Sequence, residues 1–132
     1  MNIGIIGAAA VGETLAAGFI RAGHEVLLSN RRGPASLTAL IHRLGHKAKA
    51  VTLEQAAACD MVLLAIPWVS VAQVLPALPK WGGRILIDAT NTFLSYVPDF
   101  KVADLGEDSG SEVIARLAPD ARVIKAFNTL PI

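Results

Sequence analysis

Apolar runs alternate with helix-like patterns from the first residue of the chain onward. This alternation is typical of repeated strand-helix-strand units arranged around a parallel sheet. The apolar runs are short and mostly rich in Ile, Val or Leu, and they predict six strands, over residues 2–6, 24–28, 47–51, 61–66, 84–88 and 122–127. The pattern therefore predicts an α/β fold, a doubly wound parallel six-stranded sheet of the Rossmann type with helices on both faces.

Helical spacing of apolar residues predicts the segments that join the first strands. A helix over residues 11–22 should turn one face to the sheet and end at Gly23; its apolar positions are Val11, Leu15, Phe19 and Ala22. A second helix should open at Pro34 and end at Gly45; its apolar positions are Leu37, Leu40, Ile41 and Leu44. We expect both apolar faces to be buried against the sheet.

The later connections carry different signals. Thr52 and Gln55 have the spacing of a capping box, which predicts a short helix through residue 58. Another helical stretch starts at Pro67 and should end or bend at Pro76, because proline cannot donate a backbone hydrogen bond. Gly, Pro, Asp and Ser are scattered over residues 90–110, which predicts a long loop before a last helix over residues 111–117.

Composition limits the class of protein. The chain has 132 residues, enough for one core, and nothing along it indicates a linker or a second domain, so we expect residues 1–132 to form a single domain. A hydrophobic fraction of 53% suits a covered parallel sheet with one apolar interface, and a homodimer is one state that it leaves open. A net charge of +1 provides no field that would attract nucleic acid or anionic lipid.

No apolar segment approaches the roughly 20 residues that a membrane span needs, and the amino end lacks a basic leader, so we expect neither a membrane protein nor a signal peptide. Cys59 is the only cysteine, which excludes an internal disulfide and fits a reducing cytoplasm. We therefore expect a cytoplasmic protein.

A glycine-bounded turn follows the first predicted strand and opens the first predicted helix, where a dinucleotide-binding domain holds the pyrophosphate. Gly7 would permit the tight turn, Gly12 would let helix and strand pack closely, and the free amides at the helix start would bind phosphate. The turn consists of Gly7, Ala8, Ala9, Ala10, Val11 and Gly12. Ala9 stands where a middle glycine is expected, so a purely structural turn remains an alternative.

The end of the second predicted strand bears on the choice of dinucleotide. An NAD-binding domain usually has Asp or Glu there, to bond the ribose hydroxyls. This chain has Ser29, Asn30, Arg31 and Arg32 instead. Two guanidinium groups without a nearby carboxylate favour the ribose phosphate of NADP(H), although an ordinary solvated turn is the alternative.

Ligands of such folds lie outside the carboxyl ends of the strands, in the crevice where the strand order reverses. We expect the nicotinamide side of that crevice to be formed after the fourth strand and by the segments that follow the fifth and sixth. The residues concerned are Ala65, Ile66, Pro67, Trp68, Asn91, Ala126, Phe127 and Asn128. Ile66 and Phe127 could equally be core residues.

With these segments together, the sequence resembles the deazaflavin-dependent NADP reductases of the coenzyme F420 type and their NADP-oxidoreductase relatives. The resemblance covers nearly the whole chain, over residues 3–7, 23–32, 65–68, 87–91 and 123–129. It implies hydride transfer between NADP(H) and a deazaflavin or flavin-like small molecule, in which the cofactors carry the chemistry and the protein orients two rings. It also implies a smaller carboxyl-terminal region, which we do not expect in this chain.

We predict no catalytic side chain and no metal site. His42 and His46 are four residues apart and could share a metal, but no further ligand accompanies them. Two alternatives to an oxidoreductase remain open. One is a non-catalytic NADP(H)-binding or redox-sensing module that acts through a partner, and the other is a Rossmann relative that uses a different nucleotide or none.

Overall fold

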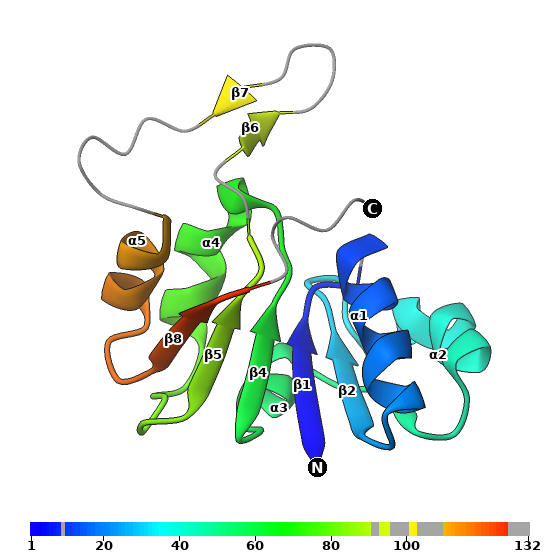
Figure 1. Cartoon of the computed structure of the whole chain (residues 1–132). Coiled ribbons are helices and arrows are strands. Elements are labelled where there is room, and N and C mark those ends of the chain that lie inside the picture. The colour runs from blue at the N-terminus through cyan, green and yellow to red at the C-terminus, as the bar shows by residue number, and fades with distance from the viewer. Residues whose placement is uncertain (9, 91–92, 96–100, 103–109, 127–132) are drawn as a thin grey trace.

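Six parallel strands form one sheet, in the order β3-β2-β1-β4-β5-β8 (Figure 1). The strands are β1 (Asn2–Ile6), β2 (Glu25–Ser29), β3 (Ala48–Ala50), β4 (Met61–Leu64), β5 (Ile85–Asp88) and β8 (Arg122–Lys125). The computed structural model describes residues 1–8, 10–90, 93–95, 101–102 and 110–126. The order reverses between β1 and β4, so the predicted doubly wound Rossmann architecture is confirmed.

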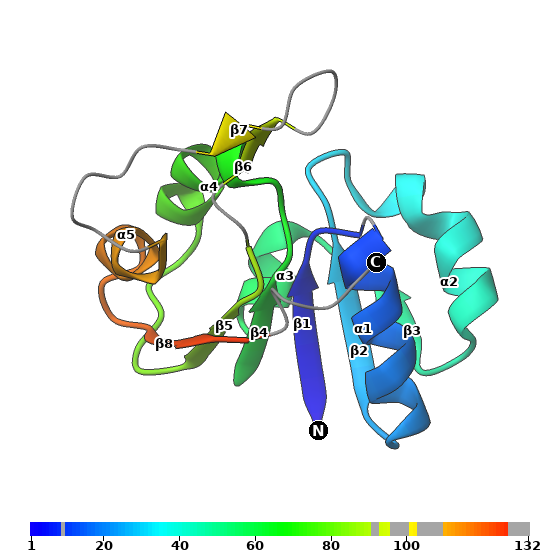
Figure 2. The ribbon, with the colours of Figure 1, turned by 45° about the horizontal axis from the view of Figure 1, so that its top comes forward.

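Helices cover both faces of the sheet (Figure 2). One face carries α1 (Ala10–Arg21) and α2 (Thr38–Leu44), and the other carries α3 (Leu53–Ala57), α4 (Trp68–Val74) and α5 (Gly110–Leu117). The predicted capping box is present at α3, because the Gln55 amide donates to Thr52 Oγ1 over 3.1 Å and the Thr52 amide donates to Gln55 Oε1 over 3.0 Å.

The structure corrects several of the sequence predictions. The segment that opens at Pro34 begins as a 3-10 helix, η1 (Pro34–Leu37), and becomes α-helical only at Thr38, and Ile41 and Leu44 are partly rather than fully buried. The loop predicted over residues 90–110 contains β6 (Phe93–Ser95), which pairs antiparallel with β7 (Lys101–Val102). These strands are too short to produce the alternating pattern from which strands are predicted.

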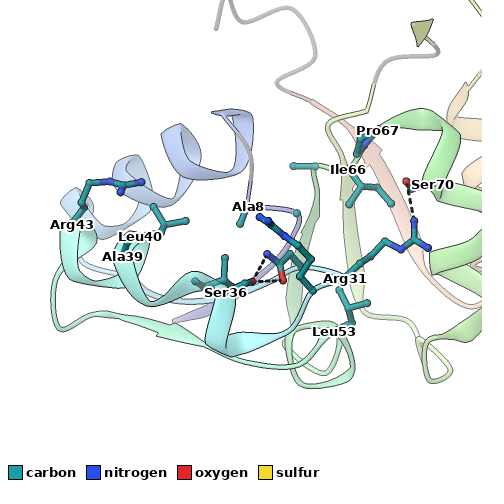
Figure 3. A pocket seen from close by; sticks show the side chains of 15 residues that line it. Ala8, Arg31, Ser36, Ala39, Leu40, Arg43, Leu53, Ile66, Pro67 and Ser70 are labelled. Atoms are coloured by element: carbon teal, nitrogen blue, oxygen red, sulfur yellow. Dashed lines mark hydrogen bonds between the residues drawn. The ribbon is translucent and has the colours of Figure 1, made fainter.

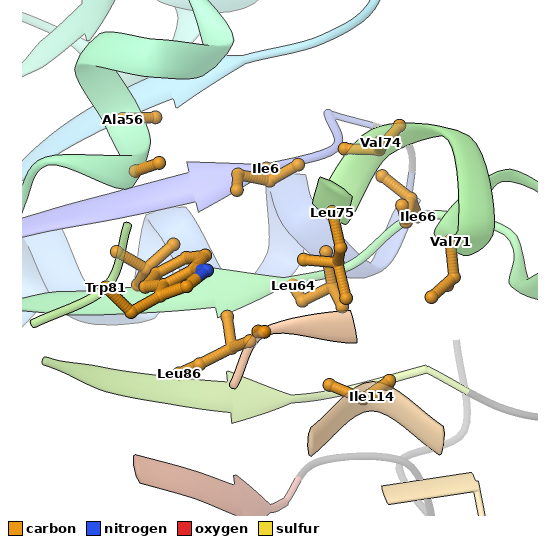
Figure 4. Close-up of a cluster of buried hydrophobic side chains, with 13 residues drawn as sticks. Ile6, Ala56, Leu64, Ile66, Val71, Val74, Leu75, Trp81, Leu86 and Ile114 are labelled. Atoms are coloured by element: carbon orange, nitrogen blue, oxygen red, sulfur yellow. The ribbon is translucent and has the colours of Figure 1, made fainter. Parts of the chain in front are cut away.

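The sheet separates two hydrophobic clusters. Successive side chains of a strand point to opposite faces, and on β1 Ile5 belongs to the cluster beneath α1 and α2, whereas Ile6 belongs to the cluster beneath α3, α4 and α5. Figure 4 shows this second cluster, in which Trp81 and Leu75 pack against Leu64 and Leu86. A second 3-10 helix, η2 (Leu75–Ala77), follows α4 where Pro76 was predicted to end it.

Within the residues that the structure describes, no helix has the length and apolar character to cross a membrane.

Candidate functional site

The turn after β1 is tightly enclosed by its neighbours. Gly7 has φ 108°, a conformation that residues with a side chain rarely adopt, and its amide donates to the Ser29 carbonyl over 2.9 Å. A Cβ added at Gly7 would overlap the carbonyl oxygen of Ala65 and lie 2.7 Å from its carbonyl carbon. Gly7 therefore lets the chain turn in the narrow space between β2 and the end of β4.

Gly12 has the second role predicted for it. It lies in the first turn of α1, and a Cβ added there would overlap the carbonyl oxygen of Gly7. This close approach directs the amino end of α1 to the carboxyl edge of the sheet, and the first amides of a helix have no acceptor within the helix itself. Ala8 and Val11 are partly buried beside this turn, Ala10 begins the helix, and Ala9 lies outside the described residues.

Ser29 ends β2, and its hydroxyl is bonded to β1. Its side chain is fully buried, and Oγ donates to the carbonyl of Ile5 over 2.8 Å. Ser29 was predicted among the cofactor-binding residues, and the structure places its hydroxyl against β1 instead. Because the residue at this position is serine, the end of β2 carries no carboxylate.

Asn30 organises the turn that follows. Its Oδ1 accepts from the Gly33 amide over 2.9 Å, and its Nδ2 donates to Ser36 Oγ over 3.0 Å. Ser36 Oγ in turn donates to the Gly33 carbonyl over 2.7 Å. These bonds connect the end of β2 to η1, so the arginines between them stand on an ordered turn.

Arg31 reaches from this turn to the opposite side of the crevice (Figure 3). Its Nη2 donates to Gln73 Oε1 of α4 over 3.0 Å, and its Nη1 lies 3.5 Å from Ser70 Oγ. Both side chains belong to α4, which follows the fourth strand. Arg31 thus joins the two halves of the doubly wound sheet above the strand ends.

A cavity of about 520 Å³ lies between the Gly7 turn, the turn after β2, α2 and the end of β4 (Figure 3). Its described lining includes three arginines and no carboxylate: Arg31, Arg32 and Arg43 are the charged members. Arg43 forms an ion pair with Glu13 of α1, with 3.1 Å between Nη2 and Oε1. The cavity is therefore suited to an anionic ligand with an apolar part, because Leu37, Leu40 and Leu53 also line it.

The cavity brings together many of the predicted site residues and leaves others out. Those that line it are Gly7, Ala8, Asn30, Arg31, Arg32, Ala65, Ile66 and Pro67. Trp68 does not line it and packs against the hydrophobic cluster beneath α4. The Ala126 amide donates to the Asp88 carbonyl over 3.1 Å, at the far side of the crevice. Asn91, Phe127 and Asn128 lie outside the described residues.

Several lining residues were not predicted. Ser36, Ala39, Leu40 and Arg43 come from η1 and α2, Leu53 opens α3, and Ser70 lies on α4. Leu37 and Leu40 had been assigned to the core alone, on their helical spacing. The prediction that a helix opens at Pro34, only a few residues after β2, was the one sequence signal that this segment lies near the end of β2.

The described residues that line the cavity supply positioning groups rather than acid-base groups. None of the described residues that line the cavity is His, Cys, Asp or Glu. Across the part of the chain that the structure describes, no three side chains of these types gather as metal ligands would. This arrangement can bind and orient a ligand that brings its own reactive group.

Comparison with known proteins identifies relatives of the same architecture. The family model described as NADP oxidoreductase, coenzyme F420-dependent, matches residues 2–92. The hypothetical protein SMa0349 from Sinorhizobium meliloti is 43% identical, with a TM-score of 0.90 over 99% of this chain and 63% of that one. A protein from Arthrobacter sp. FB24, named as a candidate F420-dependent NADP reductase, is 25% identical, with a TM-score of 0.81 over 99% of this chain and 64% of that one.

A reductive aminase from Aspergillus terreus, solved with NADPH and ethyl levulinate, is 25% identical, with a TM-score of 0.69 over 94% of this chain and 39% of that one. No curated protein sequence matches the chain. The chain thus spans less than two thirds of the length of these solved relatives.

Proposed function

The chain belongs to the family of coenzyme F420-dependent NADP oxidoreductases, and from this premise we propose that it binds NADP(H) and serves hydride transfer between that cofactor and a deazaflavin or flavin-like small molecule. The observation that carries the proposal is the cavity beside the Gly7 turn, whose described lining has three arginines and no carboxylate. Membership of the family supports the cofactor class, and the cavity supports the position that we propose for the cofactor on this chain.

The residues present fit such a cofactor. The Gly7 turn and the amino end of α1 would hold the pyrophosphate, and Arg31 and Arg32 would hold the phosphate on the adenine ribose. The apolar wall formed by Leu40 and Leu53 would receive the adenine ring. Ala65, Ile66 and Pro67 line the end of the cavity nearest β4, from which the nicotinamide half would extend.

The bound NADP(H) would supply the hydride chemistry, since a hydride exchanged between the nicotinamide and the deazaflavin ring oxidises the one and reduces the other. The chain contributes binding and orientation and keeps water from the reacting faces. Ile66, with 9% of its surface exposed, provides an apolar surface at the end of β4 for that purpose. No side chain needs to donate or accept a proton in this step.

The test is a titration of the chain with NADPH and with NADH, followed calorimetrically. If each arginine adds a charge-assisted contact, NADPH should bind about a hundredfold more tightly than NADH. Equal affinity, or affinity for neither, would overturn the cofactor proposal. Mixing the NADPH-loaded chain with oxidised coenzyme F420 then tests the second substrate, since hydride transfer bleaches the deazaflavin absorbance.

The setting of this activity is part of the proposal. We place it in the cytoplasm, where the lone thiol of Cys59 stays reduced. The redox partner is a small molecule, and the assembly to look for is a homodimer. Sedimentation of the chain with and without NADPH would test the assembly independently of the cofactor.

A further inference from the structure

Asp88 is a buried charge that the proposed chemistry does not use. Among the described residues, the buried polar side chains are Ser29, Asp88 and Thr90, and Asp88 is the charged one, with no exposed surface. A carboxylate is costly to remove from water unless its oxygens are bonded. The groups around Asp88 therefore indicate what its burial accomplishes.

The Asp88 carboxylate is bonded on both oxygens. Oδ1 accepts from the Thr90 amide over 2.9 Å and from Thr90 Oγ1 over 2.6 Å. Oδ2 lies 3.3 Å from Nζ of Lys125, whose side chain is 34% exposed. Lys125 Nζ also donates to the carbonyl of Thr90. The carboxylate, the ammonium group and Thr90 thus contact one another at this point.

These contacts lie at the carboxyl edge of the sheet. The strands β5 and β8 are neighbours in the sheet (Figure 1). Asp88 is the last residue of β5 and Lys125 the last of β8, and the two are paired in the register. The Ala126 amide donates to the Asp88 carbonyl over 3.1 Å, and the Ala89 amide donates to the Leu64 carbonyl at the end of β4 over 3.0 Å. The cluster therefore fixes the points at which the chain leaves β5 and β8.

Stability alone is a weak explanation for this pair. A buried ion pair is often no more stabilising than apolar residues of the same volume. The same strands pair through apolar residues one register step earlier, at Ile87 and Ile124. The ion pair also fixes the geometry of the sheet edge, because Lys125 bonds both the Asp88 side chain and the Thr90 backbone carbonyl there.

In a doubly wound sheet the two halves each receive one nucleotide of a dinucleotide. The cavity with its arginines belongs to the first half, formed by β1, β2 and β3, whereas Asp88 and Lys125 belong to the second half, formed by β4, β5 and β8. The geometry points to Asp88 and Lys125 as positioning residues that hold the carboxyl ends of β5 and β8 in the arrangement that receives the nicotinamide half of the cofactor. This inference rests on the proposed function.

The experiment compares two ligands that differ in the nicotinamide half. In the proposed complex NADPH would contact both halves of the sheet, whereas 2',5'-ADP would contact only the first half. Lys125→Met should weaken NADPH binding by about tenfold or more, because small misplacements at a binding site are costly, and should leave the affinity for 2',5'-ADP within about twofold. Lys125→Arg, which keeps the charge, should restore most of the NADPH affinity.

Arg122→Met is the matched control. Arg122 is a cation on the same strand, and its Nε donates to the Gly83 carbonyl over 2.7 Å at the opposite end of β8. This variant should leave the ratio of the two affinities unchanged. Because Lys125→Met leaves a buried carboxylate without its cation, Asp88→Asn with Lys125→Met is measured beside it, with thermal unfolding as the check on folding.

The outcomes separate the two proposals. If the unchanged chain binds neither ligand, the proposed function fails, and the positioning role fails with it. If the unchanged chain binds both, and the folded variants at Lys125 lose both affinities equally or lose neither, only the positioning role is overturned. A selective loss of NADPH affinity that Lys125→Arg repairs supports it.

Discussion

Nη2 of Arg31 donates to Oε1 of Gln73 over 3.0 Å, across 42 positions of sequence. The bond links the turn after β2 to α4, and so crosses the crevice between the two halves of the sheet. A neutral amide is a weaker partner for a guanidinium than a phosphate is. In the proposed complex Arg31 exchanges the amide of Gln73 for the phosphate on the adenine ribose.

The first prediction concerns this exchange. Gln73→Ala removes the competing acceptor, and since an exposed hydrogen bond of this kind contributes on the order of 1 kcal/mol, NADPH should bind roughly two- to fivefold more tightly. Calorimetric titration measures the change, and Gln73→Glu, which strengthens the competing bond, should have the opposite effect. A weaker affinity in Gln73→Ala would show that Gln73 holds Arg31 ready for the ligand.

The arginine pair itself gives the second prediction. Arg31→Ala together with Arg32→Ala should weaken NADPH binding by about a hundredfold, because each guanidinium supplies a charge-assisted contact, and should hardly change NADH binding. Arg21→Ala is the control, because this exposed arginine ends α1 and does not line the cavity. An unchanged ratio of NADPH to NADH affinity would contradict the assignment of the ribose phosphate to this pair.

The third prediction compares the effects of a carboxylate introduced at two neighbouring positions, Asn30 and Ser29. Asn30→Asp keeps the acceptor for the Gly33 amide, so the chain should fold normally, and the new charge should repel the phosphate and weaken NADPH binding roughly fivefold. Ser29→Asp buries a carboxylate at a fully buried position and should cost about 3–5 kcal/mol of unfolding free energy. Chemical denaturation and titration of both variants check the contrast, which equal stability of the two would refute.

Much of the fold could be predicted from the sequence. Each of the six strands follows from a local apolar run, and their order follows from the general rule for alternating strands and helices. Gly7 and Gly12 could be assigned because their roles are fixed by the turn between β1 and α1. The β6 and β7 pair could not, because strands of two or three residues leave no periodic signal.

The site was less predictable where it depends on tertiary contact. Arg43 enters the cavity from α2, and its ion pair with Glu13 joins residues 30 positions apart. The burial of Ser29 depends on the register of β1 and β2, which places Oγ beside the Ile5 carbonyl. Local patterns contain neither relationship, since both arise only when the helices and strands pack.

The fourth prediction compares two glycines of α1. Gly12→Ala should lower the unfolding free energy by about 1–3 kcal/mol or more, because its methyl group overlaps the Gly7 carbonyl. Gly18→Ala should raise it by roughly 0.5–1 kcal/mol, since the nearest atom in its way is 3.9 Å distant on the side chain of Arg21, and alanine is the better helix former. Urea denaturation measures both changes, and a tolerated Gly12→Ala would contradict the close packing of α1.

The fifth prediction is a dependence on pH. Burial, and next the charge of Asp60, raise the pKa of the Cys59 thiol, against the opposing effect of Arg84. Only the thiolate reacts with iodoacetamide, so Cys59 should be alkylated more slowly in the folded chain than in urea at the same mildly alkaline pH. Asp60→Asn should speed the folded reaction, whereas Asp120→Asn should not.

The raised pKa of Cys59 also determines whether the unfolding free energy rises or falls with pH. A folded-state pKa above the unfolded value means that the folded chain keeps a proton that the unfolded chain loses. The stability that Cys59 contributes in this way is fully present below the thiol pKa of the unfolded chain. It is lost as the pH rises through the thiol pKa of the folded chain. The unfolding free energy should therefore fall with alkaline pH by less in Cys59→Ser than in the unchanged chain.

The enclosure of Gly7 has a consequence for how such a domain can change. The Gly7 carbonyl occupies the space that a side chain at Gly12 would need, and the Ala65 carbonyl occupies the space that a side chain at Gly7 would need. The turn therefore cannot be altered without disturbing β1, β4 and α1 together. The exposed turn from Asn30 to Ser36 is free of that restriction. Evolutionary changes in nucleotide preference should therefore accumulate in the turn from Asn30 to Ser36. The Gly7 turn should stay nearly invariant, whichever nucleotide the domain binds.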